Sequence, residues 1–209
     1  MVGDNRASFL VEEHVPLPYD TEVEYLQSSG TQYIDTGYAY ADGYTFEIDF
    51  LGMTSNTTVF GARNSTKRTS VLYYSKTNGM TINMAAYTGS TTPFKLGNIT
   101  SRVKVKMSVL QNNGTVWVDD TKVYDNISFS GEYISSVSQA VFATKYGDND
   151  YRDITSSKVY GLKMWQGTTI IRDYIPVRVG QIGYMYDKVS KVLYGNVGTG
   201  DFTLGPDKT

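Results

Sequence analysis

VKVKMSVLQNNGTVWV, residues 103–118, is the stretch of the chain that decides the fold class. Apolar side chains alternate with polar ones in its first half, the apolar ones being Val103, Val105, Met107 and Val109. A period of two turns one face toward a core and the other toward solvent, as in a half-buried strand. The turn Asn112-Asn113-Gly114 supplies residues that tolerate positive φ, and the chain returns through Val116 and Val118. The stretch therefore predicts an antiparallel β-hairpin, with a second turn at Asp119-Asp120.

The same period recurs along the chain. Residues 44–51 alternate, with an apolar face that comprises Tyr44, Phe46, Ile48 and Phe50. Further short strands are expected at 58–62, 69–74, 80–86, 140–144, 158–165, 169–177, 182–187 and 192–194. Turn residues separate them at 147–149, 166–167, 180 and 195–196. Many short strands without alternating helices are typical of a sandwich, so the predicted fold class is all-β, a two-sheet antiparallel jelly-roll sandwich.

One domain is the expectation for 209 residues. We place it at 21–209 and treat 1–20 as an extended N-terminal arm, because Pro16 and Pro18 force their neighbours toward extended conformations. The arm is too apolar for a solvated leader, through Phe9, Leu10, Val11, Val15 and Leu17. It is predicted to be an anchor laid across a partner, with a disordered tail as the alternative. Because it lacks a basic stretch followed by an apolar one, no secretory signal peptide is expected.

Composition and charge disfavour several classes of protein. The chain has 19 basic and 21 acidic residues, for a net charge of −2, and the basic residues are scattered. Nucleic-acid binding, which needs a concentrated positive stripe, is therefore not expected. The absence of cysteine removes disulfides, zinc–thiolate sites and cysteine nucleophiles. No apolar run is long enough to predict a membrane span.

Two segments near the ends of the chain carry a family resemblance. They are EVEYLQSSGTQYIDTGY, residues 22–38, and KVYGLKMWQGTTIIRDYIPVRVGQIGYMYDKVSKVLYGNVGTGDF, residues 158–202. The matching residues of the first are Tyr25, Ser28, Ser29, Gly30, Thr31, Gln32, Tyr33, Ile34, Asp35, Thr36 and Gly37. Those of the second are Arg172, Asp173, Pro176, Gly183, Tyr186, Asp187, Gly198, Thr199, Gly200 and Phe202.

Together the two segments resemble the concanavalin A-like, laminin-G-type jelly-roll modules of bacteriophage virion proteins and gut-bacterial surface proteins. The resemblance covers residues 21–205 and implies two curved antiparallel sheets with the chain ends close together. It concerns the fold rather than an activity. Within it, Gly30, Gly37 and Gly183 are expected in turns. The side chains expected in the core are those of Tyr25, Ile34 and Phe202.

The residue pattern does not predict a catalytic site. Glu47 and Asp49 match the first two positions of the E-x-D-x-x-E strand of glucanases with the same broad fold, but the third position is Gly52. Without that third acid, the leaving group has no proton donor. The only histidine, His14, lies in the arm, where no rigid element positions it for a nucleophilic relay or a two-histidine metal site. We therefore predict a protein that is not an enzyme.

A calcium site is the one inorganic possibility. Oxygen ligands crowd one loop, namely Asp148, Asn149, Asp150 and Asp153. The twelve-residue EF-hand spacing is missing, and turns rich in Asp and Asn are ordinary. We expect no other cofactor.

Aromatic residues are the main candidates for contact with a ligand or partner. The 18 tyrosines exceed what a sandwich core needs, and exposed tyrosine and tryptophan stack on sugars and anchor protein interfaces. The candidates are Trp117, Trp165, Tyr73, Tyr74, Tyr87 and Tyr146. By alternation, the two tryptophans point away from the core. The alternative is that these rings cap the edges of the core.

Three functions follow from these features. The first is a virion surface protein of a bacteriophage (a capsid decoration, head-fibre or tail-associated module), bound through its arm to other virion or capsid proteins. Copies of the chain itself and host glycans are further expected partners. The second is a carbohydrate-binding module of a secreted gut-bacterial protein, located outside the cell or on its surface. The third is a glycoside hydrolase, which Gly52 argues against.

Overall fold

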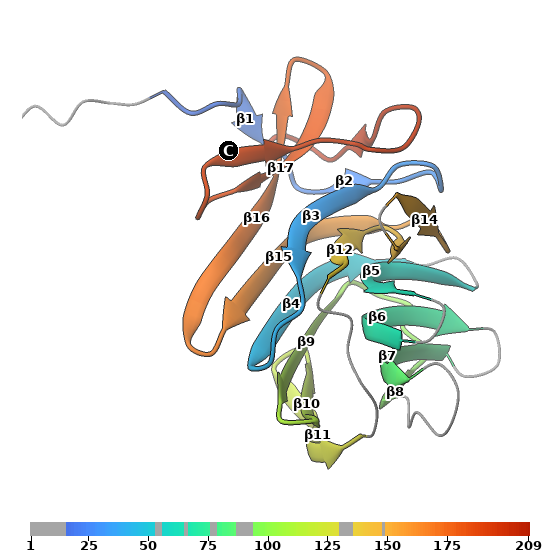
Figure 1. Cartoon of the computed structure of the whole chain (residues 1–209). Coiled ribbons are helices and arrows are strands. Elements are labelled where there is room, and N and C mark those ends of the chain that lie inside the picture. Colours follow the sequence, from blue (N-terminus) through green and yellow to red (C-terminus); the bar gives the residue numbers. More distant parts are fainter. Residues whose placement is uncertain are drawn as a thin grey trace, which may run out of the picture.

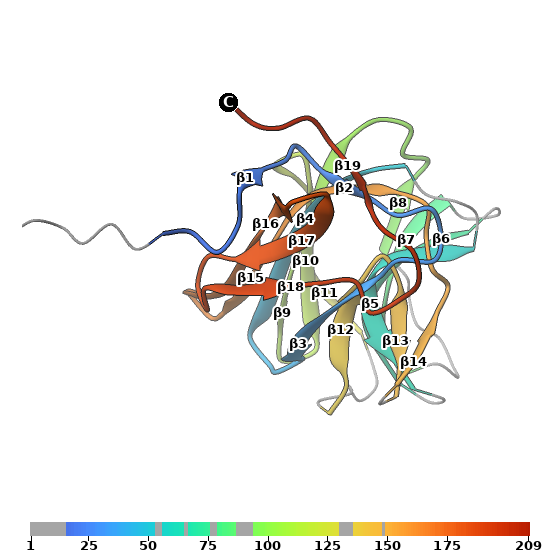
Figure 2. The same cartoon turned by 90° about the horizontal axis from the view of Figure 1, so that it is seen from above.

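The computed structural model describes residues 16–209 except 53–55, 65–66, 76–78, 87–93, 130–135 and 148. The described residues form strands and connecting turns, with no helix among them. The strands make two sheets that lie face to face (Figures 1 and 2). The prediction of an all-β, two-sheet jelly-roll-like sandwich is thereby confirmed. No helix of the described residues is long and apolar enough to cross a membrane.

The larger sheet contains the two hairpins nearest the C-terminus and the hairpin predicted at residues 103–118. Its strands, in their order across the sheet, are β11 (Thr121–Ser128), β10 (Asn113–Val118), β9 (Val103–Leu110), β4 (Tyr44–Leu51), β15 (Lys158–Gln166), β16 (Thr169–Val179), β17 (Ile182–Asp187) and β18 (Val192–Tyr194). Three short strands attach beside this path: β1 (Thr21–Glu22) to β16, and β2 (Leu26–Gln27) to both β15 and β19 (Thr203–Leu204).

The smaller sheet covers one face of the larger. Its strands, in order, are β14 (Asp150–Arg152), β13 (Thr144–Tyr146), β5 (Thr57–Arg63), β6 (Lys67–Ser75), β7 (Gly79–Ala86) and β8 (Phe94–Gly97). Beside them, β12 (Ser138–Val141) pairs with both β3 (Ile34–Ala39) and β5. Pairing in both sheets is antiparallel except between β5 and β13, which run parallel.

The core lies between the sheets and is filled by the alternating apolar faces. Phe46 and Ile48 of β4 are fully buried, as is Phe60 of β5, and the rings of Phe46 and Phe60 meet at 5.0 Å across the two sheets. A large apolar side chain buried in this way stabilises the fold by about 1.5–3 kcal/mol relative to its exposed state. The opposite positions of β4 therefore face outward from the larger sheet.

The hairpin at residues 103–118 forms as predicted, but its turn lies earlier in the sequence than predicted. The residues with positive φ are Gln111 and Asn112, and Asn113 already pairs with Leu110. Gly114 lies within β10, where it pairs with Val109, and a Cβ there would lie 2.7 Å from the Phe94 ring. Packing, and not turn geometry, requires this glycine.

The second turn is as predicted. Asp119 and Asp120 both have positive φ, and Val118 pairs with Thr121 across them. Two residues with positive φ match the right-handed twist of the flanking strands. This turn joins β10 to β11, which lies at the edge of the sheet.

The strand expected at 140–144 is interrupted. Phe142 adopts a φ of +70°, and its N–H donates to the carbonyl of Val59. The break separates β12 from β13 and lets β13 run parallel to β5. A burial pattern alone does not reveal such a break, since Phe142 stays buried.

The two resembling segments lie against each other, as the resemblance implies. The N–H of Glu24 donates to the carbonyl of Pro206, and that of Lys208 to the carbonyl of Glu22. Ile34 and Phe202 are buried, as expected. The C-terminal segment therefore lies beside β1 (Figure 1).

Three details of the resemblance are corrected. Gly37 was expected in a turn, but it lies within β3, where its φ is +64°. Gly183 was expected in a turn, but it lies within β17, where a Cβ would approach Leu26 to 2.6 Å and Leu204 to 2.8 Å. Tyr25 was expected in the core, but it is half-buried and packs against Tyr160. Because neighbours alternate along a strand, the adjacent Leu26 takes the core position.

Candidate functional site

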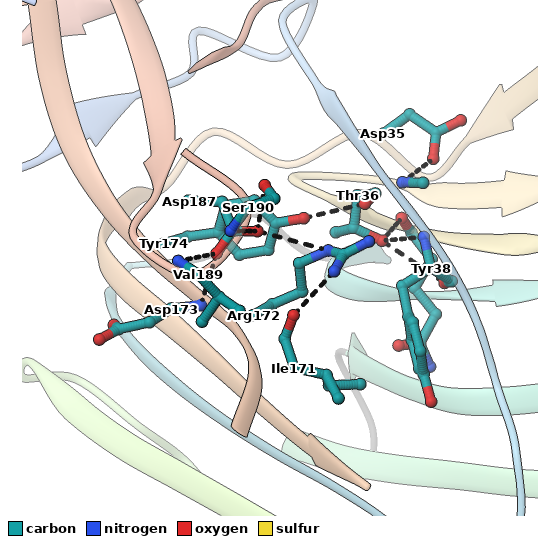
Figure 3. Close-up of polar contacts among 12 residues, drawn as sticks. Asp35, Thr36, Tyr38, Ile171, Arg172, Asp173, Tyr174, Asp187, Val189 and Ser190 are labelled. Carbon is teal, nitrogen blue, oxygen red and sulfur yellow. Dashed lines mark hydrogen bonds and ion pairs between the residues drawn. The ribbon is translucent and has the colours of Figure 1, made fainter. Parts of the chain in front are cut away.

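Asp187 of the closing segment is a structural residue. Its carboxylate is fully buried and accepts hydrogen bonds from the backbone N–H groups of Asp173, Val189 and Ser190, and from the Ser190 hydroxyl at 2.6 Å (Figure 3). Arg172 lies 3.6 Å away as its ion-pair partner. A buried charge is tolerated when it is paired and hydrogen-bonded in this way. Asp187 thus stabilises the turn between β17 and β18.

The opening segment meets the closing one at Thr36. The Tyr174 hydroxyl donates to the Thr36 carbonyl at 2.8 Å (Figure 3). The Thr36 hydroxyl in turn donates to the Gln139 carbonyl at 2.7 Å. Burial raises the pKa of Tyr174, which stays a hydrogen-bond donor at all ordinary pH values. These motif residues hold the two sheets together and offer no open surface to a ligand.

The open polar surface lies elsewhere, on the outer face of the larger sheet, which is the face turned away from the smaller sheet. One row of residues crosses it in direct register: Trp117, Lys106, Glu47, Lys163 and Asp173, on β10, β9, β4, β15 and β16. Directly opposed residues on neighbouring strands have Cβ atoms about 5 Å apart. The row is therefore a continuous band of aromatic and charged side chains.

Trp117, Lys106 and Trp165 form the cluster at one end of this band, which we call the Trp–Lys–Trp cluster. The Lys106 ammonium lies 5.5 Å from the ring centroid of Trp117 and 5.2 Å from that of Trp165. Both distances are those of cation–π contacts. The Lys106 ammonium thus contacts one tryptophan on β10 and one on β15, two strands that lie on opposite sides of β4.

A depression of about 200 Å³ lies beside this cluster on the same face. The side chains around it include Glu47, Asp49, Lys104, Tyr160, Lys163 and Asp173. Aromatic and hydrogen-bonding groups that converge on a concave surface are the usual composition of a ligand site. The outer face therefore combines stacking platforms with donors and acceptors.

Arg102 positions two of the side chains that line the depression, those of Asp49 and Tyr160. Its guanidinium donates two hydrogen bonds to the Asp49 carboxylate, at 2.9 and 2.8 Å, and lies 3.7 Å from the ring centroid of Tyr160. A bidentate arginine–carboxylate pair has a defined geometry as well as favourable energy. Asp49 and Tyr160 are thus held in place in the free protein.

The structure brings together two of the predicted aromatic candidates. Trp117 and Trp165 share the outer face of the larger sheet, whereas Tyr73, Tyr74 and Tyr146 belong to strands of the smaller sheet. Tyr74 is half-buried and packs against the core, as the alternative interpretation holds. Tyr87 lies outside the described residues.

Sequence reasoning did not single out Lys106, Arg102 or Tyr160. Alternation had placed Lys104 and Lys106 on the outward face of their strand, which was the available signal. Their neighbours on other strands are far away in the sequence, so the cluster appears only once the strands are paired.

The acids of the proposed calcium loop face arginines. Asp150 accepts a hydrogen bond from Arg152 at 2.7 Å, and Asp153 pairs with Arg63 at 3.8 Å. Asp148 lies outside the described residues, and Asn149 is exposed. Within the part of the chain that is described, no three acidic or histidine side chains gather as a metal site would require. The calcium site stays a prediction without geometric support.

Most of the predicted arm lies outside the described residues, including Phe9, Leu10, Val11, His14 and Val15. Of its apolar residues, Leu17 is described and is exposed. Pro16, Leu17 and Pro18 line a hollow together with Tyr186 and Lys191, and the Tyr19 ring contacts Tyr186 at 4.9 Å. The end of the arm nearest the sandwich is thus seated on the larger sheet, and its anchoring role stays a prediction.

Comparison with solved structures finds a similar fold in a "putative carbohydrate binding protein" from Bacteroides ovatus ATCC 8483. The TM-score is 0.59, the sequence identity is 12%, and the match covers 90% of this chain. It covers 61% of that protein, so the chain spans less than two thirds of its length. At this identity the likeness establishes a shared β-sandwich fold. No family model matches the chain. No curated protein matches it either.

Proposed function

We propose that the chain is a carbohydrate-binding module of the concanavalin A-like jelly-roll class, and that it binds its ligand on the outer face of the larger sheet. The observation that carries the proposal is the Trp–Lys–Trp cluster beside the acid-lined depression. Such a module acts outside a bacterial cell or on its surface. We propose further that it does not catalyse.

The chemistry of the outer face suits a saccharide. An indole ring offers a flat apolar surface that stacks against the C–H face of a sugar ring. Carboxylates and ammonium groups accept and donate hydrogen bonds to its hydroxyl groups. Trp117 and Trp165 supply the first kind of contact, and Glu47, Asp49 and Lys163 are available for the second.

The proposal that the chain does not catalyse is supported by Asp49 and Gly52. Both oxygens of Asp49 accept hydrogen bonds from Arg102, which suits an acceptor better than a proton donor. Gly52, at the end of β4, has a φ of +74° and carries no acid to take the third position of the glucanase strand. The strand therefore offers two of the three acids of the glucanase pattern.

The virion role predicted from the sequence is the second candidate. It depended on the apolar arm, most of which lies outside the described residues. The comparison with solved structures favours carbohydrate binding, because the similar protein carries that description in its name. We therefore place carbohydrate binding first.

Substitution of Trp117 or Trp165 by alanine tests the proposal. A glycan array, with and without calcium, identifies a ligand, and titration calorimetry measures its affinity. Each substitution is expected to weaken binding tenfold to hundredfold, because loss of an aromatic contact at a binding centre costs about 1–3 kcal/mol. Tyr146→Ala, on the smaller sheet, is the matched control and should bind normally. Binding that survives both tryptophan substitutions would place the site elsewhere, and an array without any ligand would refute the proposal.

A further inference from the structure

The lysines and arginines of the chain divide into two groups by their partners. Most of those whose side chains are described lie within ion-pair distance of a carboxylate, as in Arg178–Asp207 at 2.7 Å and Lys145–Asp35 at 2.6 Å. Those without such a carboxylate among the described residues are Lys95, Lys104, Lys106, Lys158, Lys163 and Lys191. All of these except Lys95 and Lys191 lie on β9 or β15. Most of the described lysines without an ion pair are thus gathered on the two strands that flank β4.

Acids of the outer face lie opposite Lys104, Lys106 and Lys163 in the register, but none forms an ion pair with them among the described residues. Asp49 is already paired with Arg102, and Asp173 lies 3.5 Å from Lys188. Glu47 is left, and it stands between Lys106 and Lys163, directly opposite both in the register. Directly opposed charges of opposite sign attract each other, so Glu47 partly offsets the charge of both lysines.

Lys106 differs from the other lysines of the face because its ammonium lies near two aromatic rings, whereas that of Lys158 lies near one, Tyr25, at 4.1 Å. Contacts with Trp117 and Trp165 hold its ammonium between two rings. A cation–π contact orients a cation without neutralising its charge. Between the two stacking platforms there is consequently a positive charge that has no carboxylate within ion-pair distance in the described part of the chain.

We infer that the saccharide bound by this face is acidic, and that its carboxylate or sulfate group is held by Lys106 while its ring stacks on the tryptophans. This inference rests on the proposed carbohydrate-binding function and deepens it. It assigns the class of ligand by charge, which the similarity of folds does not do.

Paired probes separate the charge of the ligand from its shape. Oligogalacturonides and the same oligosaccharides with every carboxyl group reduced to a hydroxymethyl group differ in charge alone. We expect the wild-type protein to bind the acidic form at least about tenfold more tightly, as charge-assisted hydrogen bonds are roughly twice as strong as neutral ones. The preference should shrink as salt is added, because screening weakens contacts between exposed charges.

Lys106→Gln is the decisive variant, and Lys95→Gln is its control, since Lys95 is an unpaired lysine on β8 of the other sheet. Lys106→Gln should lose the preference for the acidic form while it retains binding of the reduced form, and Lys95→Gln should keep the preference. Circular dichroism and the melting temperature check that both variants are folded.

The other outcomes overturn the inference in distinguishable ways. Equal binding of the acidic and reduced forms by the wild-type protein would refute an acidic ligand but leave the carbohydrate-binding function intact. An unchanged preference in Lys106→Gln would remove Lys106 from the contact. Failure of both forms and of the glycan array would refute the function itself. Binding of oligothymidylate through the same tryptophans, with no saccharide bound, would make the face a nucleic-acid surface instead.

Discussion

Asp35 joins three parts of the smaller sheet through one carboxylate. It accepts hydrogen bonds from Lys145 at 2.6 Å, from the Tyr151 hydroxyl at 2.9 Å and from the Gly37 N–H at 2.9 Å. The Tyr151 ring stacks on Tyr33 at 4.3 Å. Lys145 is almost completely buried, so its charge depends on Asp35 as a partner. The aspartate of the opening motif is therefore a structural residue, as is Asp187 of the closing one.

These contacts shift the pKa values of Asp35 and Tyr151. Burial alone would raise the pKa of Asp35, but the hydrogen bonds from Lys145, Gly37 and Tyr151 outweigh it and lower that pKa below its ordinary value. Burial raises the pKa of Tyr151, and its hydrogen bond to Asp35 raises it further. A lowered carboxyl pKa means that the ionised form stabilises the folded state.

Asp35→Asn is expected to destabilise the fold by about 3 kcal/mol at neutral pH, because it leaves the buried Lys145 without its counter-charge. Since the folded pKa of Asp35 lies below the unfolded one, this contribution is fully present above the unfolded pKa of about 3.9. It is lost as the pH falls through the folded pKa. Urea unfolding of the wild-type and variant proteins from pH 7 to pH 3 measures the difference. A difference that stayed constant down to pH 3 would contradict an ionised Asp35.

At the scale of elements, the segment 197–199 lies along the opening motif and is hydrogen-bonded to it outside the named strands. The N–H of Val197 donates to the Tyr33 carbonyl, and that of Thr199 donates to the Thr31 carbonyl at 3.1 Å. Between these bonds lies Gly198, where a Cβ would come within 2.0 Å of the Thr31 carbonyl oxygen. Real side chains do not tolerate such an approach to backbone, so the glycine of this motif is required by proximity.

Gly198→Ala should therefore cost about 1–3 kcal/mol of stability, the usual range for an overpacked position. Thr199→Ala is its control, because Thr199 contributes its backbone to these contacts and its side chain is exposed. The melting temperatures of the two variants, measured by circular dichroism, give the comparison. Equal melting temperatures would show that the segment separates from the opening motif without loss.

At the scale of the whole molecule, one core serves both sheets and the segments near the two ends are hydrogen-bonded to each other. Residues 22–24 pair with 206–208, and the rings of Phe142 and Phe202 meet at 5.1 Å inside the sandwich. A structure without a separable part is expected to unfold cooperatively.

We predict a single unfolding transition for the domain at 21–209. Both tryptophans of the chain lie on the larger sheet, so their fluorescence reports on that sheet. Far-ultraviolet circular dichroism reports on the strands of both sheets. Coincident urea curves from the two probes are the expected result, whereas an earlier transition in one probe would reveal a sheet that unfolds independently.

The sequence by itself determined the fold class, most of the long strands and the outward orientation of Trp117 and Trp165, because alternation between core and solvent is a local pattern. It did not place the break at Phe142 or the packing role of Gly114, which depend on distant neighbours. Only the tertiary structure decided that Lys106 lies between the two tryptophans. Strand register is set by packing of the whole core, and it brought together side chains on three strands that no local pattern relates.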